Sequence, residues 1–398
     1  MNPESLLQPD FDFDQLVNRD HSNSLKYDGR LSMFGKSDVI PLWVADMDFA
    51  SPAAVTEALL QRASHPIYGY SSFPESTYRA LMDWLKRRHG WHIEREWIVL
   101  CPGVVPSLSA AVMAFTEPGD AVIVQPPVYF PFFSAVTDSA RSLVLNPLNL
   151  DNDQYQIDFS HLESCAAHAK MLLLCSPHNP VGRVWRKDEL ERLLAIAAQY
   201  NLIIFADEIH ADLVYPPAKH QMLAPMSQQP KNIITAVAPS KTFNIPGLNL
   251  SALIIPDAGQ RQALVKVFER MHISAANPFS MVAFEAAYQH GDAWLDALLS
   301  YLQQSRDFVL HYVSEHLPEI HAITPEGTYL VWLDCRALGL DDAALKQFFI
   351  QQAGVGLSPG RLFGEAGSGF MRMNIAAPRS VIAAALQRIA NALSTHKK

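Results

Sequence analysis

The sequence predicts an α/β fold: a large domain with a mostly parallel seven-stranded sheet, followed by a smaller α+β domain. Seven short, nearly continuous apolar runs lie in the middle of the chain, separated by longer amphipathic segments. Continuous apolar character over the length of a strand is typical of strands covered on both faces, and alternation with helices favours a parallel sheet. Near residue 292 the alternation gives way to a long helical stretch, which indicates a second domain.

The seven runs are expected to form strands, in chain order WIVLC (97–101), AVIVQ (121–125), SLVLN (142–146), MLLLCS (171–176), LIIFAD (202–207), IITAV (233–237) and SALII (251–255). Helices are expected between them. Within residues 106–115, Leu108, Val112 and Phe115 recur at helical spacing, and residues 187–199 carry a similar apolar stripe.

The second domain is expected to begin with a helix over 294–317 and to contain strands at YLVWLD (329–334) and FMRMNIA (370–376). The first 48 residues have little regular pattern before IPLWVADMDF and are compatible with packing on either domain. We expect residues 1–48 to pack with the small domain, residues 49–291 to form the large domain and residues 292–398 the small one.

Composition and charge argue against several classes of partner. The 398 residues carry 31 basic and 40 acidic side chains, a net charge of −9, and an acidic surface repels nucleic-acid phosphates. The longest uncharged stretches are interrupted by prolines, and the acidic N-terminus lacks the profile of a signal peptide. The four cysteines show no CxxC spacing and are expected to be reduced thiols. We therefore expect a cytoplasmic protein that binds neither nucleic acid nor membrane.

Three common site motifs are missing from the sequence. No GxGxxG follows an expected strand, and neither a Walker A loop nor a GxSxG nucleophile elbow occurs. The fifteen histidines are scattered without HExxH context, so no metal is expected. A Rossmann dinucleotide site and an α/β-hydrolase are both disfavoured.

Polar side chains follow three of the expected strands. Asn179 comes after MLLLC, Asp207 ends LIIFAD, and Lys241 follows IITAVAP. In open α/β sheets, ligands bind beyond the carboxyl ends of the strands, so these three side chains can converge on one crevice. Pyridoxal 5'-phosphate needs a lysine amine to bind its aldehyde and an acid to keep its ring nitrogen protonated. Lys241 and Asp207 fit these two needs, and Asn179 fits the ring hydroxyl.

Further residues fit the same cofactor. Val104 and Val105 lie where Gly103 joins a strand to a helix, and free N–H groups at a helix N-terminus bind phosphate. Ser240 could add a hydroxyl, Tyr129 could stack on the ring, and His210 lies three residues after Asp207. Taken singly, each has an ordinary alternative, such as a helix cap, a surface lysine, a core aromatic or a turn.

With these residues in view, the chain resembles the fold-type I pyridoxal-phosphate enzymes of the class I/II aminotransferase superfamily. Within it, the chain looks most like the MalY/PatB-type cystathionine β-lyases (C–S lyases). The resemblance covers nearly the whole length and rests on PLWVADMDF, YGYSSF, PPVYFPF, LCSPHNPVGRVW, FADEIHADL, APSKTFNIPGLNLS, EGTYLVWLD, SPGRLFG and FMRMNIAAPR.

The resemblance implies a role for each matching residue. Lys241 would bind the cofactor aldehyde, and Asp207 and Tyr129 would complete the catalytic set by pairing with the ring nitrogen and stacking on the ring. Cofactor contacts would also come from Val104, Val105, Asn179, His210 and Ser240. Tyr70 would reach the cofactor phosphate of a partner subunit, which implies a homodimer.

The substrate would be held by Arg372, clamping its α-carboxylate, and by backbone at Ala45. The strand pattern agrees, because Arg372 projects opposite to Met371 and Met373. Asn249 stands where many aminotransferases carry an arginine, and position 210 is histidine where aspartate aminotransferases have tyrosine. Both departures favour the lyase branch without deciding the reaction.

Three functions follow in order of preference. The first is α,β-elimination of L-cystathionine or a related cysteine S-conjugate, giving pyruvate, ammonia and a thiol. The second is transamination of amino acids with the same residues. The third, a non-enzymatic regulatory role on this scaffold, has no support in the sequence.

Overall fold

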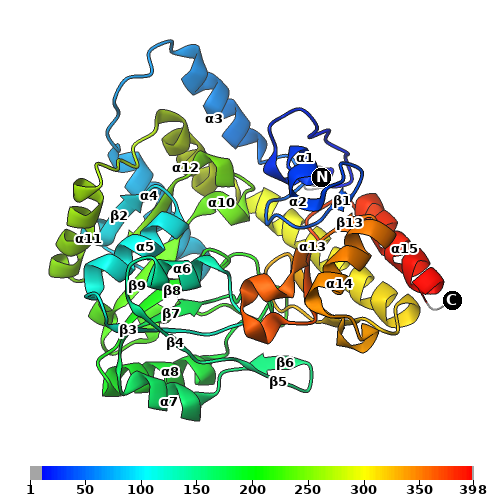
Figure 1. Ribbon diagram of the computed structural model, residues 1–398. Helices are drawn as coiled ribbons and strands as arrows, with labels where there is room; N and C mark the ends of the chain where they lie inside the picture. Colours follow the sequence, from blue (N-terminus) through cyan, green and yellow to red (C-terminus); the bar gives the residue numbers. More distant parts are fainter. Residues whose placement is uncertain (1–10, 397–398) are drawn as a thin grey trace, which may run out of the picture.

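The computed structural model describes residues 11–396, and its larger part is built on one seven-stranded sheet (Figure 1). The strands are β2 (Ile98–Cys101), β3 (Ala121–Val124), β4 (Ser142–Leu145), β7 (Ala169–Cys175), β8 (Ile203–Asp207), β9 (Ile233–Val237) and β10 (Ser251–Ile254). Their order is β2-β10-β9-β8-β7-β3-β4, and only β10 runs antiparallel to its neighbours. Each predicted apolar run forms one of these strands, so the predicted fold class is confirmed.

The apolar runs are continuous because both faces of the sheet are covered. Along β7, Leu172 and Leu174 lie in one hydrophobic cluster, whereas Met171 and Leu173 lie in another. The first cluster includes residues of α7 (Phe159–Ala166) and α8 (Lys187–Gln199), and the second includes residues of α5 (Val104–Phe115), α6 (Pro131–Thr137) and α11 (Ala258–Arg270). Alternate side chains of one strand therefore pack on helices of opposite layers.

Helices α3 (Ala53–Ser64), α4 (Glu75–His89) and α12 (Pro278–His290) pack together, and α3 reaches away from the sheet in Figure 1. The connection from α3 to α4 is long and exposed. The remaining elements of this part are the short helices η1 (Arg95–Trp97), α9 (Leu223–Met226), η2 (Pro230–Asn232), α10 (Pro239–Thr242) and η3 (Pro246–Leu248), and a hairpin of β5 (Asn149–Asp151) and β6 (Gln154–Gln156).

The C-terminal part begins with α13 (Asp292–His316), close to the predicted helix at 294–317. It holds an antiparallel sheet of order β11-β12-β15-β14, in which the predicted strands at 329–334 and 370–376 are neighbours. The elements are β11 (His321–Ile323), β12 (Leu330–Asp334), η4 (Arg336–Leu338), α14 (Asp342–Gln347), η5 (Phe348–Gln352), β13 (Val355–Gly356), β14 (Ser358–Pro359), η6 (Gly360–Phe363), η7 (Glu365–Gly367), β15 (Phe370–Asn374) and α15 (Arg379–His396).

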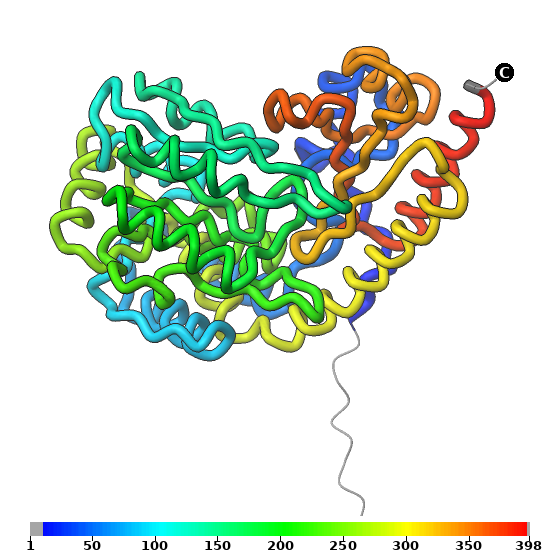
Figure 2. The backbone as a smooth tube through the Cα atoms, turned by 90° about the horizontal axis from the view of Figure 1, so that it is seen from below, coloured from blue at the N-terminus to red at the C-terminus, as the bar shows by residue number. Residues whose placement is uncertain are grey.

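The described part of the N-terminal segment, residues 11–48, lies beside the C-terminal part (Figure 2). It contains α1 (Leu25–Asp28), α2 (Arg30–Phe34) and β1 (Ile40–Pro41), and β1 pairs in parallel with β13. The ring of Phe13 contacts those of Trp294 and Tyr301 at centroid distances of 5.7 and 5.5 Å. Residues 1–10 of the predicted segment lie outside the described residues. The domain boundaries at 48/49 and 291/292 stay a prediction.

A buried ion cluster anchors this N-terminal segment. Lys26 is fully buried, and its ammonium donates to Asp48 Oδ2 at 2.9 Å. Arg19 donates to Asp48 Oδ1 at 2.6 Å and to Asp46 Oδ2 at 2.7 Å, and the Tyr27 hydroxyl donates to Asp48 at 3.2 Å. Two cations and two anions thus neutralise one another, and Lys26 and Asp48, the two members withdrawn from water, are paired as buried charges must be.

Gly182 lets the loop after β7 lie close to the segment that joins β11 and β12 of the small sheet. Its φ is +71°, and a Cβ there would lie 2.4 Å from Pro325 Cβ. The Gly182 carbonyl accepts hydrogen bonds from the N–H groups of Glu326 and Gly327, at 2.8 and 3.0 Å. The backbone therefore requires glycine at this position, and the loop that carries Asn179 is tied to the C-terminal part.

Two further features concern the described residues as a group. No helix among residues 11–396 is long and apolar enough to cross a membrane. All four cysteines are unpaired and buried, as expected for reduced thiols, and burial raises the pKa of the Cys101 thiol to about 12 and that of Cys175 and Cys335 still further.

Replacing Lys26 by methionine should destabilise the protein by about 3 kcal/mol. Removing one partner of a buried ion pair costs about 3–5 kcal/mol because the other charge stays buried, and Arg19 still pairs with Asp48 here. Urea unfolding followed by circular dichroism measures the loss.

The matched control is Lys36→Met. Lys36 pairs with the exposed Asp38 at 3.7 Å, and such a surface pair contributes less than about 1 kcal/mol. Equal losses for the two variants would contradict the anchoring role of the buried cluster.

Candidate active site

A cavity of about 690 Å³ lies at the carboxyl ends of the large sheet, under residues of the N-terminal segment and the small sheet. Ten of the eleven residues predicted for the site line it: Ala45, Val104, Val105, Tyr129, Asn179, Asp207, His210, Ser240, Lys241 and Arg372. They come from segments far apart in the sequence, and the parallel strands bring them together as expected for an open α/β sheet.

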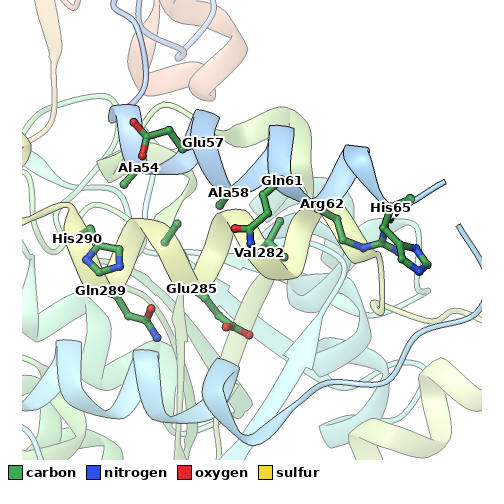
Figure 3. A pocket seen from close by; sticks show the side chains of 11 residues that line it. Ala54, Glu57, Ala58, Gln61, Arg62, His65, Val282, Glu285, Gln289 and His290 are labelled. Carbon is green, nitrogen blue, oxygen red and sulfur yellow. Dashed lines mark hydrogen bonds between the residues drawn. The ribbon is translucent and has the colours of Figure 1, made fainter. Parts of the chain in front are cut away.

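A second hollow of about 740 Å³ lies between α3 and α12 (Figure 3). Its lining includes Glu57 and Gln61 of α3 and Glu285 and Gln289 of α12, and of these four side chains only that of Glu285 is partly buried. None of the predicted site residues lies there. The cavity at the sheet has buried polar groups that converge, so it is the candidate active site although its volume is slightly smaller.

Lys241 lies in α10, directly after β9, and its Nζ donates to the carbonyl of Ala45 at 2.7 Å. The Lys241 side chain is partly buried, and the surface that it keeps faces the cavity. Burial lowers the pKa of Lys241 to about 8, and the nearby charge of Arg372 acts in the same direction. The amine therefore loses its proton much more readily than an exposed lysine.

Asp207 ends β8, and its carboxylate is buried at the floor of the cavity. Burial raises its pKa to about 7, against the lowering effects of a hydrogen bond from the Ile209 N–H and of the charge on Lys241. Oδ1 accepts that bond at 3.2 Å, and Oδ2 has no hydrogen-bond partner among the described residues. A buried carboxylate with one free oxygen can accept a hydrogen bond from an N–H or another protonated group of a ligand.

Arg372 is a buried guanidinium without an acidic partner in residues 11–396. It donates to Asn179 Oδ1 at 3.0 Å, to the carbonyl of Trp43 at 2.8 Å and to Ser358 Oγ at 3.3 Å, and its Nε has no partner. Burial lowers its pKa to about 10. A buried cation held only by neutral acceptors indicates that the site receives an anion. Its strand neighbours Met371 and Met373 lie in the core cluster instead.

His210 and Tyr129 add aromatic surface to the cavity. Burial lowers the pKa of His210 to about 3, so the imidazole is neutral, and its Nδ1 has no hydrogen-bond partner among the described residues. Tyr129 is partly exposed to the cavity, and its N–H donates to the carbonyl of Asn179 at 3.1 Å. The orphaned nitrogen of His210 is a further sign that the cavity is built around a polar ligand.

The N-terminus of α5 opens onto the same cavity. The N–H groups of Val104 and Val105 have no acceptor in the described part of the chain, Pro106 has no N–H, and Ser107 N donates to the carbonyl of Gly103 at 3.2 Å. Ser240 contributes its hydroxyl to the lining. Free amides and a helix dipole together suit a phosphate group.

Tyr70 is the predicted residue that does not reach the cavity. It lies on the connection between α3 and α4, where its side chain is fully exposed. The neighbouring Ile67 and Tyr68 are exposed as well, so this segment presents apolar side chains outward.

Several groups at the cavity were missed by sequence reasoning. The Tyr329 hydroxyl donates at 2.9 Å to the same Ala45 carbonyl that accepts from Lys241, and Trp43 and Ser358 hold Arg372. All three belong to motifs that mark the family resemblance. Their roles depend on backbone carbonyls and on packing between distant segments, for which a sequence carries no direct signal. Asn249, noted as a departure, also lines the cavity.

Comparison with known proteins gives consistent matches over nearly the whole chain. The model of the family "Aminotransferase class I and II" matches residues 37–389. Cystathionine β-lyase PatB of Bacillus subtilis is 42% identical, and the match covers 96% of this chain and 100% of PatB. Protein MalY of Escherichia coli is 33% identical, and the match covers 96% of this chain and 99% of MalY.

Solved structures give the same picture. A pyridoxal-phosphate-bound putative aminotransferase from Clostridium difficile has a TM-score of 0.95 at 41% identity, covering 96% of this chain and all of its own. Cystalysin from Treponema denticola, which contains pyridoxal 5'-phosphate, has a TM-score of 0.93 at 38% identity, covering 97% and 99%.

The shifted pKa of Lys241 predicts a pH-dependent stability in protein stripped of bound small molecules. Its folded pKa of about 8 lies below the ordinary 10.5, so the buried charge destabilises the fold below pH 8, and the penalty fades as pH rises from 8 to about 10.5. Lys241→Met should therefore raise the unfolding free energy by about 2 kcal/mol at pH 7, after allowing for the lost bond to Ala45, and by almost nothing near pH 10.5.

Urea titrations at a series of pH values measure this difference. Lys187→Met is the control, because the exposed Lys187 forms only a surface pair with Glu191. A stability gain for Lys241→Met that does not change with pH would refute the prediction that the buried charge of Lys241 destabilises the fold below pH 8.

Proposed function

Because the chain belongs to the aminotransferase class I and II family, we propose that it is a pyridoxal-phosphate-dependent carbon–sulfur β-lyase. Its substrate is L-cystathionine or a related cysteine S-conjugate, and its products are pyruvate, ammonia and a thiol. The observation that carries the proposal is the convergence of Lys241, Asp207 and Arg372 on one cavity. The names of the relatives PatB of Bacillus subtilis and the cystathionine β-lyase of Corynebacterium glutamicum support the choice of reaction.

The residues of the cavity fit pyridoxal phosphate. Asp207 would pair with the ring nitrogen, Asn179 with the ring hydroxyl, and Tyr129 would cover a ring face, with the orphaned Nδ1 of His210 beside them. The free amides of Val104 and Val105 and the hydroxyl of Ser240 would hold the phosphate. Lys241 would bind the aldehyde carbon. When bound, the cofactor supplies an electron sink that makes the α-hydrogen of an amino acid acidic.

The remaining chemistry falls to side chains of this chain. Arg372 binds and orients the substrate α-carboxylate, with its guanidinium already held by Trp43 and Ser358. Lys241 Nζ accepts the α-hydrogen as a proton, and its lowered pKa keeps the amine ready as a base near neutral pH. The Ala45 carbonyl, 2.7 Å from Nζ, fixes the direction of the amine.

Transamination of amino acids is the second candidate. The family model and the Clostridium difficile structure, called a putative aminotransferase, favour it. The same residues serve both reactions, since they differ in where the proton goes and in whether Cβ carries a leaving group. Asn249 and His210 match the lyase branch of the family and so favour the lyase. Both would contact the cofactor rather than the substrate side chain, so they do not decide between the two reactions.

We also propose a cytoplasmic homodimer in which Tyr70 contributes to the partner's site. The exposed side chains of Ile67, Tyr68 and Tyr70 support such an interface. They belong to the connection between α3 and α4, whose backbone runs along the outside of the molecule in Figure 1. Within each chain we propose a large domain over 49–291 and a small domain over 292–398, with the N-terminal segment on the latter.

Purified protein loaded with pyridoxal phosphate should convert L-cystathionine to equimolar pyruvate and homocysteine over many turnovers without any keto acid. The assay couples pyruvate to lactate dehydrogenase and measures thiol separately. Turnover that appears only when a keto acid is added would identify an aminotransferase instead. Lys241→Ala, which lacks the base, is the background control and should lose at least about 10³-fold in rate.

Mixed dimers test whether Tyr70 acts across the interface. Lys241→Ala and Tyr70→Ala homodimers should each be impaired. If Tyr70 serves the partner, co-refolding equal amounts should restore about a quarter of the wild-type activity, because half of the dimers are mixed and each has one intact site. No recovery would mean that Tyr70 serves the site of its own chain, and an unimpaired Tyr70→Ala homodimer would mean that Tyr70 serves neither site.

A further inference from the structure

One cation at the cavity has no task in the proposed reaction. Lys346 lines the cavity from α14, where its side chain is half-buried. It has no hydrogen bond and no ion pair within residues 11–396. Such a lysine at the wall of a binding cavity is available to a ligand.

The natural partner of Lys346 is engaged elsewhere. Asp342 precedes it by four residues on α14, the spacing at which opposite charges normally pair. The Asp342 carboxylate instead accepts from Ser368 Oγ at 2.9 Å and from the Gly369 N–H at 2.8 Å. The local structure therefore holds the acid of this potential pair against the loop before β15 and leaves Lys346 unpaired.

The other charged groups of the cavity already have partners in the proposed function. Lys241 and Asp207 serve the cofactor, and Arg372 serves the α-carboxylate. The phosphate is met by the amides of α5. Asp207 is the only acidic side chain among the described cavity residues, and it is buried at the floor. After all these assignments, Lys346 is the one cation of the described cavity lining that still lacks an anion.

Apolar side chains line the same cavity as Lys346. They include Met33 and Phe34 of α2, Leu357 and Leu362. A substrate side chain that extends to Lys346 therefore lies in a cavity with apolar lining and meets a cation that has no other task. We propose that the leaving group is an apolar chain that ends in a carboxylate, bound by Lys346.

This inference rests on the proposed lyase function and specifies its substrate class. L-cystathionine carries both a carboxylate and an ammonium at the far end of its leaving group. The described lining offers Lys346 to the carboxylate but no acidic side chain to that ammonium. S-(3-carboxypropyl)-L-cysteine, which is cystathionine without the far amino group, should therefore be used at least as well as cystathionine.

The test compares S-(3-carboxypropyl)-L-cysteine with its neutral amide, S-(3-carbamoylpropyl)-L-cysteine, on the cofactor-loaded enzyme. The wild type should prefer the carboxylate by about 10-fold in kcat/KM, as expected for a partly exposed charged hydrogen bond. Lys346→Met should bring this ratio close to one, and Lys346→Arg should restore most of it. Gln347→Met, an exposed neighbour on α14 outside the lining, should leave the ratio at its wild-type value.

The dissociation constants of the same pair, measured by calorimetry, separate the two proposals. If neither compound yields pyruvate, the lyase function fails, and the ratio of the dissociation constants then decides the role of Lys346. A ratio near one in the wild type, or a 10-fold ratio that survives in Lys346→Met, would overturn the carboxylate assignment.

Discussion

The irregular backbone of residues 43–49 is the part on which the rest of the site depends. Its Ala45 carbonyl accepts hydrogen bonds from Lys241 of α10, which follows strand β9 of the large sheet, and from Tyr329, which precedes strand β12 of the small sheet. Around it, Asn374 Nδ2 donates to the carbonyls of Val44 and Asp46, both at 2.6 Å, and Asn244 holds the backbone of Met47 and Phe49. Because each part of the chain supplies a donor to this one segment, the reactive amine, the guanidinium and the cavity roof keep fixed relative positions.

Charge inside the cavity follows from the same arrangement. Lys241, Arg372 and Lys346 are cations, and Asp207 is the only acid in the described lining, with its pKa raised toward neutrality. A cavity with such an excess of positive charge is costly to build unless anions occupy it. The ion cluster of Arg19, Lys26, Asp46 and Asp48 shows the opposite design, since its charges balance within the protein and it serves as an anchor.

Sequence reasoning succeeded where the pattern is local. The seven strands were predictable because their apolar runs have strand length and, along central strands such as β7, are buried on both faces. The convergence of Asn179, Asp207 and Lys241 on one cavity was predictable because each lies at or just after the carboxyl end of a strand of the same sheet. It did not identify β10 as the antiparallel strand, because strand direction depends on pairing partners. It also missed the burial of Lys26 and the role of Tyr329, which depend on contacts with segments more than twenty residues away. Tyr70 was predicted from resemblance alone, and its exposed position shows why no argument from a single chain would place it at the site.

The buried cysteines bear on chemical compatibility between the protein and its own products. Thiol–disulfide exchange needs a thiolate that can reach a disulfide sulfur, and burial raises the pKa of Cys101, Cys175 and Cys335 far above neutral pH. Cys175 even borders the cavity in which a thiol would be set free. A protonated, enclosed sulfhydryl at that place does not form mixed disulfides with sulfur compounds that leave the site. Burial thus protects Cys101, Cys175 and Cys335 from covalent modification by the sulfur compounds that the chain handles.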